Sequence, residues 1–264
     1  MKNSDGPQAV LFDMGGTIED VWVDSATYLS GAKSMAQRLY EEGITAKRLA
    51  PERIRELVEN GLVDYKEWAM ERGVESSPLD IWSKWLLKGE MTGPSALTAV
   101  VAEWLSLTYE TVCLSRRLRP EAYPTLAGLK ERGYILGVIS NTISETQVAQ
   151  TLGKHDLEKY FDTVQASVLA GSRKPDPTML LQASKELSVS SEQCMYVGDN
   201  PSRDILGARN AGYGWALLIT SPDSHKPRPE LAKPSDPSVK APWEAHITSL
   251  LEILELVDER PWSV

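Results

Sequence analysis

The feature that most constrains the fold is an apolar run near the N-terminus that ends at an acidic residue. The run Ala9-Val10-Leu11-Phe12 leads directly into Asp13, and Gly15, Gly16 and Thr17 follow. An apolar run of this length that is ended by glycine predicts a strand buried on both faces, as in a parallel sheet. Ligands of an open parallel sheet bind at the carboxyl ends of its strands, so Asp13 is a candidate nucleophile or metal ligand. By itself, the stretch is equally compatible with a turn that carries a solvated aspartate.

Three further stretches place polar or charged residues at the ends of other predicted elements. A second apolar run ends in Ser140-Asn141, and a basic pair that includes Lys174 lies just before a Pro-rich helix start. A third apolar run ends in Gly-Asp at Asp199, and Asp204 follows five residues later. A carboxylate, a hydroxyl, a lysine and an acidic pair therefore follow one another, each at the end of its own element.

These four motifs, in this order, resemble those of the haloacid dehalogenase superfamily. The resemblance covers the predicted core of the chain, and the four-part match is specific. It implies an α/β fold with a Rossmann-like parallel-sheet core, in which all four motifs lie at the carboxyl edge of one sheet.

From Pro120 onward, predicted strands and helices alternate, which implies parallel strand pairing through right-handed crossovers. The pattern predicts strands at 9–13, 135–140, 163–167, 195–198 and 215–219, with an edge strand at 245–247. It predicts helices at 121–133, 144–152, 177–187, 205–211 and 247–257. The Pro-rich stretch Ser221–Pro242, which contains His225, is expected to be a surface loop.

Residues 21–120 lack the alternation of strands and helices, because their apolar residues recur at helical spacing and no strand is predicted among them. Helices are expected over 25–42, over 51–70 with a break at Gly61, from 78 onward, and over 94–114. The tryptophans of this insert are expected to build its core, with substrate contact by one or two as the alternative. The insert resembles the cap that the family places after its first motif. The predicted domains are a catalytic core (1–20 and 121–264) and a helical cap (21–120).

The resemblance also implies a Mg²⁺ site. The family's ligands are the nucleophile of the first motif, the backbone carbonyl two residues later and the first acid of the fourth motif. These positions correspond to Asp13, Gly15 and Asp199. Asp204 corresponds to a second acid that holds a metal-bound water or orients Lys174. An all-oxygen set of this kind suits Mg²⁺.

Catalytic roles follow from the same resemblance. Asp13 is expected to attack phosphorus in line and form an aspartyl phosphate, which water then hydrolyses. Lys174 would neutralise the charge that builds up, while Ser140 and Asn141 donate hydrogen bonds to the transferring group. The chain is therefore predicted to be a Mg²⁺-dependent hydrolase, most simply a phosphatase that acts on a small phosphorylated metabolite.

The first motif, Asp13-Met14-Gly15-Gly16-Thr17, is atypical. Gly16 and Thr17 are expected to bind substrate, but phosphatases of the family usually carry an aspartate where this chain has Gly15. That aspartate protonates the leaving oxygen and then activates water, which is worth about 10²–10⁴-fold in rate.

Gly15 leaves four interpretations open. The substrate has a good leaving group that needs no proton, or the reaction is C–P cleavage. Phosphonatases of the family carry a small residue at this position and use a cap lysine as a Schiff base; the candidate cap lysines are Lys33, Lys47, Lys66, Lys84 and Lys88. A 2-haloacid dehalogenase is disfavoured, because Asp199 and Asp204 are intact. The fourth interpretation is a catalytically impaired phosphate-binding protein.

The composition limits the partners. The chain has 264 residues and a formal net charge of -9, which argues against non-specific nucleic-acid binding. No apolar run approaches the roughly 20 residues that span a bilayer, and the N-terminal residues lack a signal-peptide pattern. We therefore expect a cytoplasmic protein without a nucleic-acid or membrane partner. The sequence indicates neither the oligomeric state nor the physiological substrate.

Overall fold

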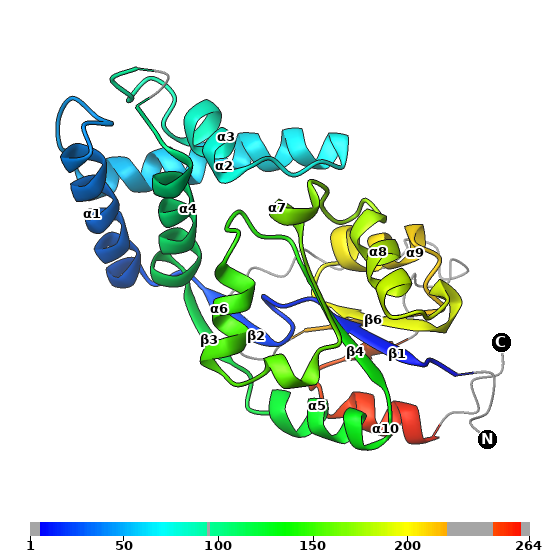
Figure 1. Ribbon diagram of the computed structural model, residues 1–264. Helices are drawn as coiled ribbons and strands as arrows, with labels where there is room; N and C mark the ends of the chain where they lie inside the picture. Colours follow the sequence, from blue (N-terminus) through cyan, green and yellow to red (C-terminus); the bar gives the residue numbers. More distant parts are fainter. Residues whose placement is uncertain (1–5, 94–95, 221–244, 260–264) are drawn as a thin grey trace, which may run out of the picture.

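Six parallel strands form the centre of the molecule (Figure 1). The computed structural model describes residues 6–93, 96–220 and 245–259. The strands are β1 (Ala9–Phe12), β4 (Ile135–Ser140), β5 (Thr163–Ala166), β6 (Cys194–Gly198), β7 (Trp215–Ile219) and β8 (Ala245–Ile247). They lie in the order β5-β4-β1-β6-β7-β8, and every neighbouring pair is parallel. The predicted α/β fold with a Rossmann-like parallel-sheet core is confirmed.

Helices cover both faces of this sheet. One face carries α5 (Ala122–Glu131), α6 (Gln147–Lys154) and α10 (Glu252–Glu259), and the other carries α8 (Thr178–Glu186) and α9 (Leu206–Asn210). Along β1, Val10 and Phe12 pack against the first set, whereas Ala9 and Leu11 pack against the second. Successive side chains of a strand point to opposite faces, so a strand covered on both sides must be apolar throughout. This is why the N-terminal run is uninterrupted.

Several short turns complete the core. They are the single helical turn α7 (Ser167–Ala170), the 3₁₀ turns Glu158–Tyr160 and Ser191–Gln193, and the π-helical turn Pro201–Ile205. The helix predicted at 205–211 corresponds to α9, and the π-helical turn directly precedes α9 and includes Ile205. π-helical turns are rare and occur frequently at functional sites.

The chain between the strands β2 (Glu19–Trp22) and β3 (Ser115–Leu118) forms a separate group of helices, here termed the helical layer. It contains α1 (Ser25–Glu41), α2 (Pro51–Arg72), α3 (Pro78–Ile81), α4 (Ala99–Thr108) and the π-helical turns Trp82–Leu86 and Tyr109–Cys113. In Figure 1 these helices occupy the upper left and the top of the molecule, away from α5 and α10. Their buried residues form a hydrophobic cluster of their own, to which the core adds Ile143.

Close packing within the helical layer explains Gly61. The predicted helix break at this residue is wrong, because α2 continues through it. A Cβ atom at position 61 would lie 2.8 Å from the carbonyl oxygen of Trp85, so glycine lets α2 approach the neighbouring turn closely. Trp82 is fully buried, and Trp68 and Trp85 pack against Tyr65. The tryptophans therefore contribute to the packing of this layer, as expected.

Two short strands contradict the prediction that residues 21–120 contain none. β2 (Glu19–Trp22) and β3 (Ser115–Leu118) pair in antiparallel fashion where the chain enters and leaves the helical layer. The sequence of β3, Ser-Arg-Arg-Leu, lacks an apolar stripe, so no local pattern predicts it. The division into a core (1–20 and 121–264) and a cap (21–120) stays a prediction.

Three predicted helices begin at least three residues later than expected, and one of them is α6, which begins at Gln147 rather than at 144. α10 begins at Glu252 rather than at 247, because the Glu252 carboxylate accepts hydrogen bonds from the backbone N–H groups of Thr248 and Ser249 in the turn that precedes it. α4 begins at Ala99, where the side chain of Thr98 forms its N-cap. Residue 94, Ser221–Pro242 and His225 lie outside the described residues.

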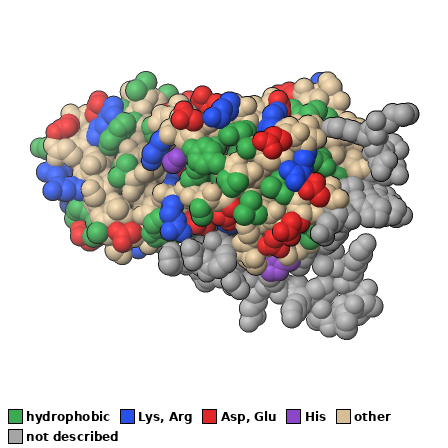
Figure 2. Space-filling model, turned by 90° about the horizontal axis from the view of Figure 1, so that it is seen from below, with side chains coloured by type: hydrophobic (Ala, Val, Ile, Leu, Met, Phe, Trp, Pro, Cys, Tyr) green, Lys and Arg blue, Asp and Glu red, His purple; other side chains and the backbone are tan. Residues whose placement is uncertain are grey.

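The surface seen from below mixes acidic, basic and apolar side chains without a continuous basic block in its coloured part (Figure 2). This is consistent with the acidic composition, and the expected absence of a nucleic-acid partner stays a prediction. Within the described ranges, every helix is too short or too polar to cross a bilayer.

Candidate active site

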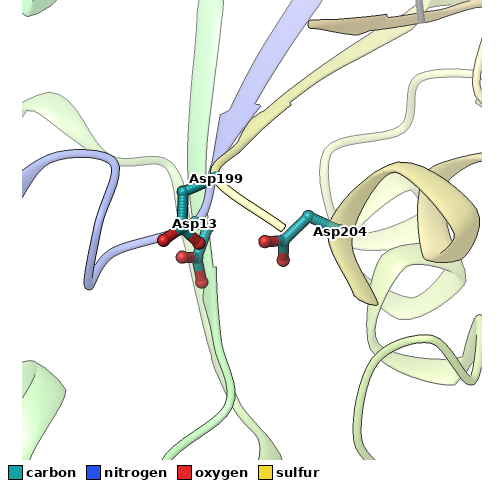
Figure 3. A group of neighbouring side chains, drawn as sticks. All are labelled: Asp13, Asp199 and Asp204. Carbon is teal, nitrogen blue, oxygen red and sulfur yellow. The ribbon is translucent and has the colours of Figure 1, made fainter. Parts of the chain in front are cut away.

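Two neighbouring strands of the sheet bring three carboxylates together. Asp13 follows β1, Asp199 follows β6, and Asp204 lies in the π-helical turn after β6 (Figure 3). One oxygen atom from each carboxylate lies within 4.8 Å of the others. Asp13 and Asp204 are buried. Buried carboxylates this close together repel one another unless positive charge lies between them.

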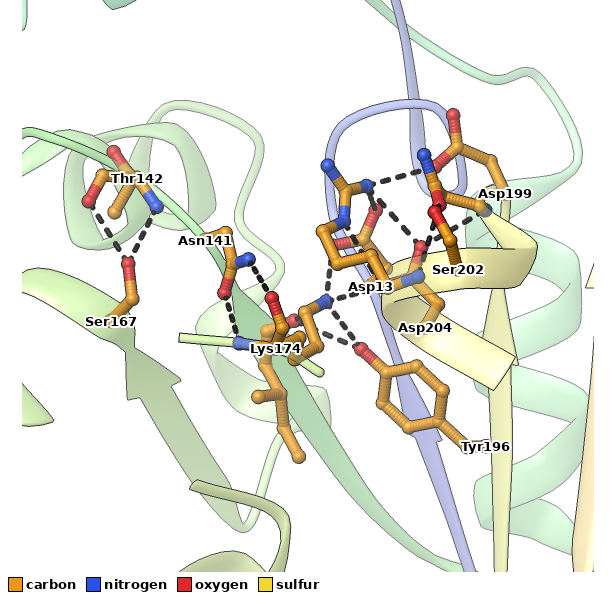
Figure 4. A network of polar contacts seen from close by, with 12 residues as sticks. Asp13, Asn141, Thr142, Ser167, Lys174, Tyr196, Asp199, Ser202 and Asp204 are labelled. Atoms are coloured by element: carbon orange, nitrogen blue, oxygen red, sulfur yellow. Dashed lines mark hydrogen bonds and ion pairs between the residues drawn. The ribbon is translucent and has the colours of Figure 1, made fainter. Parts of the chain in front are cut away.

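Lys174 supplies part of that charge. Its Nζ atom lies 2.7 Å from Oδ1 of Asp13 and 2.7 Å from Oδ1 of Asp204 (Figure 4). It also donates to the carbonyl oxygen of Ile139 at 2.8 Å and to the hydroxyl oxygen of Tyr196 at 2.6 Å. The side chain of Lys174 is completely buried. The structure thus brings together residues that lie 161 positions apart in the chain.

Arg203 carries no predicted role, yet its guanidinium group contacts all three carboxylates. Its Nη2 atom lies 3.5 Å from Oδ2 of Asp13, 3.1 Å from Oδ1 of Asp199 and 3.2 Å from Oδ2 of Asp204. The side chain of Asn200 accepts from the backbone N–H of Arg203 and so caps this turn. The only sequence signal is the spacing of four residues from Asp199, which places an arginine over an aspartate on a helical turn.

These cations set the protonation of the cluster. Burial by itself raises the pKa of Asp204, but Arg203 and Lys174 together lower it to about 2. Burial and the negative charge of Asp204 raise the pKa of Asp13, and Lys174 opposes this effect. The two cations therefore favour the anionic form of Asp204, which pairs with Lys174 beside Asp13.

Asn141 positions Lys174 through its backbone. The Asn141 side chain donates to the carbonyl oxygen of Lys174 at 3.0 Å and accepts from its backbone N–H at 3.0 Å. Ser140 is the last residue of β4, and both Ser140 and Asn141 line a cavity together with Asp13. Two of the predicted donors are therefore placed beside the predicted nucleophile.

Gly16 and Thr17 are placed differently. The backbone N–H of Gly16 donates to the carbonyl oxygen of Glu19, and that of Thr17 donates to Met14 within the turn. Thr17 is fully buried and, unlike Gly15, is not among the residues that line the cavity. Substrate binding by Gly16 and Thr17 stays a prediction, and the visible role of Gly16 is steric. A Cβ atom there would lie 2.1 Å from Oδ2 of Asp199.

The cavity beside Asp13 has a volume of about 470 Å³, a size typical of small-molecule sites. Residues from the core and from the helical layer line it together. They are Asp13, Gly15, Val21, Trp22, Val23, Lys66, Tyr109, Glu110, Leu114, Arg116, Ser140, Asn141, Gln147 and Arg203.

The lining of the cavity includes part of an ion-pair cluster that no sequence motif predicts. Arg116 of β3 lies 3.0 Å from Oε2 of Glu19 and 2.5 Å from Oε2 of Glu110. Burial raises the pKa of Glu19, and Arg116 opposes that rise. A Cβ atom at Gly15 would lie 3.7 Å from Nη1 of Arg116, so this guanidinium borders the place of the family's usual acid.

Comparisons with known proteins agree with this geometry. The chain is 37% identical over 118 residues to glyceraldehyde 3-phosphate phosphatase of Methanothermobacter thermautotrophicus, a match that covers 44% of this chain and 50% of that protein. It is 28% identical over 230 residues to phosphoglycolate phosphatase of Photorhabdus laumondii, covering 83% and 87%. The more similar of these curated relatives are matched over half of their length or less.

A solved structure and a family model complete the comparison. The crystal structure of 2-haloacid dehalogenase from Pseudomonas syringae superimposes with a TM-score of 0.60 at 22% identity, covering 97% of this chain and 100% of that one, which shows the shared fold. A family model described as haloacid dehalogenase-like hydrolase matches residues 7–212. With four motif residues meeting at one sheet edge, the chain belongs to the haloacid dehalogenase-like hydrolase family.

Proposed function

We propose that this protein is a Mg²⁺-dependent phosphatase that hydrolyses a small phosphorylated metabolite through an aspartyl phosphate on Asp13. One observation carries the proposal: Lys174 bridges Asp13 and Asp204, and Asp13 itself lines a cavity sized for a small molecule. The phosphatases among its relatives act on glyceraldehyde 3-phosphate, phosphoserine and phosphoglycolate by name, which supports the same substrate size.

The residues present fit a divalent cation. Asp13, Asp199 and Asp204 offer an all-oxygen set, and Oδ2 of Asp13 is buried without a hydrogen-bond partner. Asp13 and Asp199, with the carbonyl oxygen of Gly15, would hold the ion. Asp204 would act indirectly, through its ion pair with Lys174. When bound, Mg²⁺ supplies positive charge that offsets the phosphoryl oxygens.

The chain's own residues then account for the two chemical steps. A carboxylate oxygen of Asp13 bonds to phosphorus as the bond from phosphorus to the leaving oxygen breaks, and water afterwards displaces Asp13 to release inorganic phosphate. Lys174, 2.7 Å from the carboxylate, opposes the rise in the pKa of Asp13 and would offset the charge of the transition state. Ser140, which lines the same cavity as Asp13, would donate a hydrogen bond to the phosphoryl group.

We also propose that the helical layer, residues 21–120, acts as a cap that selects the leaving group. The cavity supports this assignment, since Lys66, Tyr109 and Glu110 of the helical layer face Asp13 and Ser140 of the core. Such an arrangement excludes water from the reaction and places specificity in the cap.

A second candidate function is C–P cleavage. Among the lysines considered for an imine, Lys66 lines the same cavity as Gly15 and Asp13. Burial lowers the pKa of Lys66, which favours the neutral amine that attacks a carbonyl. In this alternative the amine condenses with a substrate carbonyl and releases water, and the imine accepts the electrons of the breaking C–P bond. Borohydride reduction in the presence of an aldehyde-bearing phosphonate should then attach the substrate to Lys66.

The test of the main proposal is a panel of phosphorylated metabolites, phosphonates and 2-haloacids, assayed with Mg²⁺ and with excess chelator. The parent protein should release phosphate from esters only with Mg²⁺, and Asp13→Asn should abolish release, because an amide cannot attack. Asp64→Asn, an exposed position on α2, is the matched control and should keep full activity.

Beryllium fluoride with Mg²⁺ should bind the parent and not Asp13→Asn. Near-parental activity of Asp13→Asn would exclude the covalent mechanism. Binding of beryllium fluoride without turnover of any ester would favour the impaired phosphate-binding protein, and full activity in chelator would favour dehalogenation.

A further inference from the structure

Lys66 is the unpaired cation of the cavity. Three cationic side chains line it, and two of them are held by carboxylates. Arg203 contacts Asp13, Asp199 and Asp204, and Arg116 contacts Glu19 and Glu110. Within residues 6–93, 96–220 and 245–259, Lys66 has no hydrogen bond or ion pair of its own.

The surroundings of Lys66 leave its charge incompletely compensated. Its side chain remains exposed to the water of the cavity, but the protein walls around it lower its pKa by desolvation. The charges of Glu110 and Glu75 oppose this lowering, and those of Arg173 and Arg203 add to it. Each carboxylate of this set already has an arginine partner, Glu110 with Arg116 and Glu75 with Arg173. An ammonium group in this state gains more from an added anion than one already in an ion pair.

The position of Lys66 relates this free charge to the reaction. Asp13, where the phosphoryl group is proposed to bind, belongs to the core, whereas Lys66 belongs to α2 in the helical layer, and both line the same cavity. Val21, Trp22 and Leu114 add apolar side chains to the lining. The cavity beside Asp13 therefore offers a leaving group both apolar contacts and a cation of the helical layer.

We infer that Lys66 binds an anionic group, a carboxylate or a second phosphate, on the leaving group of the substrate. This inference rests on the proposed phosphatase function and names its substrate class: small phosphate monoesters that carry a second negative charge away from the reacting phosphorus. The ammonium group of Lys66 offers three donors and no acceptor, so it favours such a group over a neutral amide or hydroxyl. Its positive charge also offsets the repulsion between the phosphoryl group and the second anionic group of the substrate.

The experiment compares substrates that differ only in this charge. Phosphoglycolate is paired with its neutral amide, and ethylene glycol bisphosphate is paired with the monophosphate, so that the two arms separate carboxylate from phosphate. The parent protein should prefer the anionic member of at least one pair by about 10- to 100-fold in kcat/KM, the size expected for one charge-assisted hydrogen bond.

Three variants assign that preference to Lys66. Lys66→Met should remove the preference, mainly through KM, and should leave kcat/KM for the neutral member within about 3-fold. Lys66→Arg should keep part of it. Lys84→Met is the matched control, because Lys84 lies on the outer surface of the same layer and pairs with Asp80 at 2.9 Å.

Calorimetry keeps the inference separate from the proposed activity. Binding of the same four compounds is measured with Mg²⁺ to Asp13→Asn and to Asp13→Asn combined with Lys66→Met. If no ester is hydrolysed by the parent, the phosphatase proposal fails, while tighter binding of the anionic member that Lys66→Met abolishes still upholds the inference. Equal kcat/KM and equal affinity for both members of each pair would overturn it, as would a preference that persists in Lys66→Met.

Discussion

Glu75 and Arg173 form an ion pair between the helical layer and the core, with Oε1 of Glu75 3.2 Å from Nη1 of Arg173. Tyr65 and Ser167 donate hydrogen bonds to the same carboxylate, whose side chain is fully buried. Arg173 directly precedes Lys174, so the end of α2 is joined to the loop that carries this lysine. The Glu75 carboxylate therefore connects the helical layer to the loop of the core that contains Lys174.

The first prediction uses the pH dependence of this link. Burial raises the pKa of Glu75 above its ordinary value of 4.5, and Arg173 opposes the rise without cancelling it. The folded state therefore holds this proton more tightly than the unfolded state. The stability that the group contributes is fully present below pH 4.5 and is lost as the pH rises through the folded pKa. The measurement is urea unfolding of the parent and of Glu75→Gln at several pH values. The free energy of unfolding of the parent minus that of the variant should fall as the pH rises from 4.5.

Glu186→Gln is the control with the opposite sign. Hydrogen bonds from Thr163 and Gln182 lower the pKa of Glu186, so its contribution is present above pH 4.5 and is lost on acidification. A parent-minus-variant difference that is flat with pH for Glu75→Gln, or that rises for both variants, would contradict the assignment.

The second prediction concerns Gly16 and uses Gly43 as its matched control. Both residues have positive φ, +102° and +67° respectively, so alanine strains the backbone at either position. That strain alone costs about 1–2 kcal/mol. Only at position 16 would the new Cβ atom meet Asp199, whereas nothing lies within 4 Å of it at position 43. Gly16→Ala should therefore also raise the Mg²⁺ concentration needed for activity, and Gly43→Ala should not. Equal Mg²⁺ requirements of the two variants would show that the contact with Asp199 is unimportant.

The third prediction concerns Arg203 as a cation that compensates the three carboxylates. Arg203→Met leaves Asp13, Asp199 and Asp204 with less positive charge, which should destabilise the metal-free protein by up to about 3 kcal/mol. Mg²⁺ should then raise the thermal midpoint of the variant more than that of the parent, because the ion replaces the lost charge. Thermal unfolding with Mg²⁺ and with chelator measures both midpoints.

Arg132→Met controls for the loss of an arginine, since Arg132 pairs with Asp258 on the surface, at 2.6 Å. It should leave the Mg²⁺-dependent shift of the parent unchanged. A shift for Arg203→Met no larger than that of the parent would show that the arginine and the ion do not compensate the same charges.

The fourth prediction concerns the acid that Gly15 replaces. A Cβ atom at position 15 would lie 3.3 Å from Cγ2 of Val21 and 3.7 Å from Nη1 of Arg116, so Gly15→Asp requires only a small shift of a valine. The new carboxylate would lie beside a guanidinium group, which lowers its pKa and weakens it as a general acid. Hydrolysis of alkyl phosphates should therefore rise by less than the roughly 10²–10⁴-fold that such a group can supply.

Hydrolysis of p-nitrophenyl phosphate by Gly15→Asp should rise less still, since nitrophenolate leaves without a proton. The ratio of the two rate gains, in a folded and Mg²⁺-saturated variant, is the measurement. Equal gains on both substrates would show that protonation of the leaving group is not what the parent site lacks.

The amino-acid pattern was sufficient to predict the sheet and to place the candidate site residues at the ends of its strands. A strand covered by helices on both faces must be apolar along its whole length, so β1, β4 and β6 stand out as runs that end at Asp13, Ser140 and Asp199. Parallel strands bring their carboxyl ends to one edge, so the order of the motifs already implied their meeting.

The folded structure was needed to find which charges compensate one another. The contact of Tyr196 with Lys174, the contact of Arg203 with Asp13 and the ion-pair cluster around Arg116 arise from pairings that no local spacing encodes. The same holds for the short strands β2 and β3. The helical layer separates them along the chain, and they form by pairing with each other, without an apolar pattern of their own. Hydrophobic burial imposes a period that can be read along the chain, whereas an ion pair needs only that two side chains meet in space, and the completed fold alone decides where they meet.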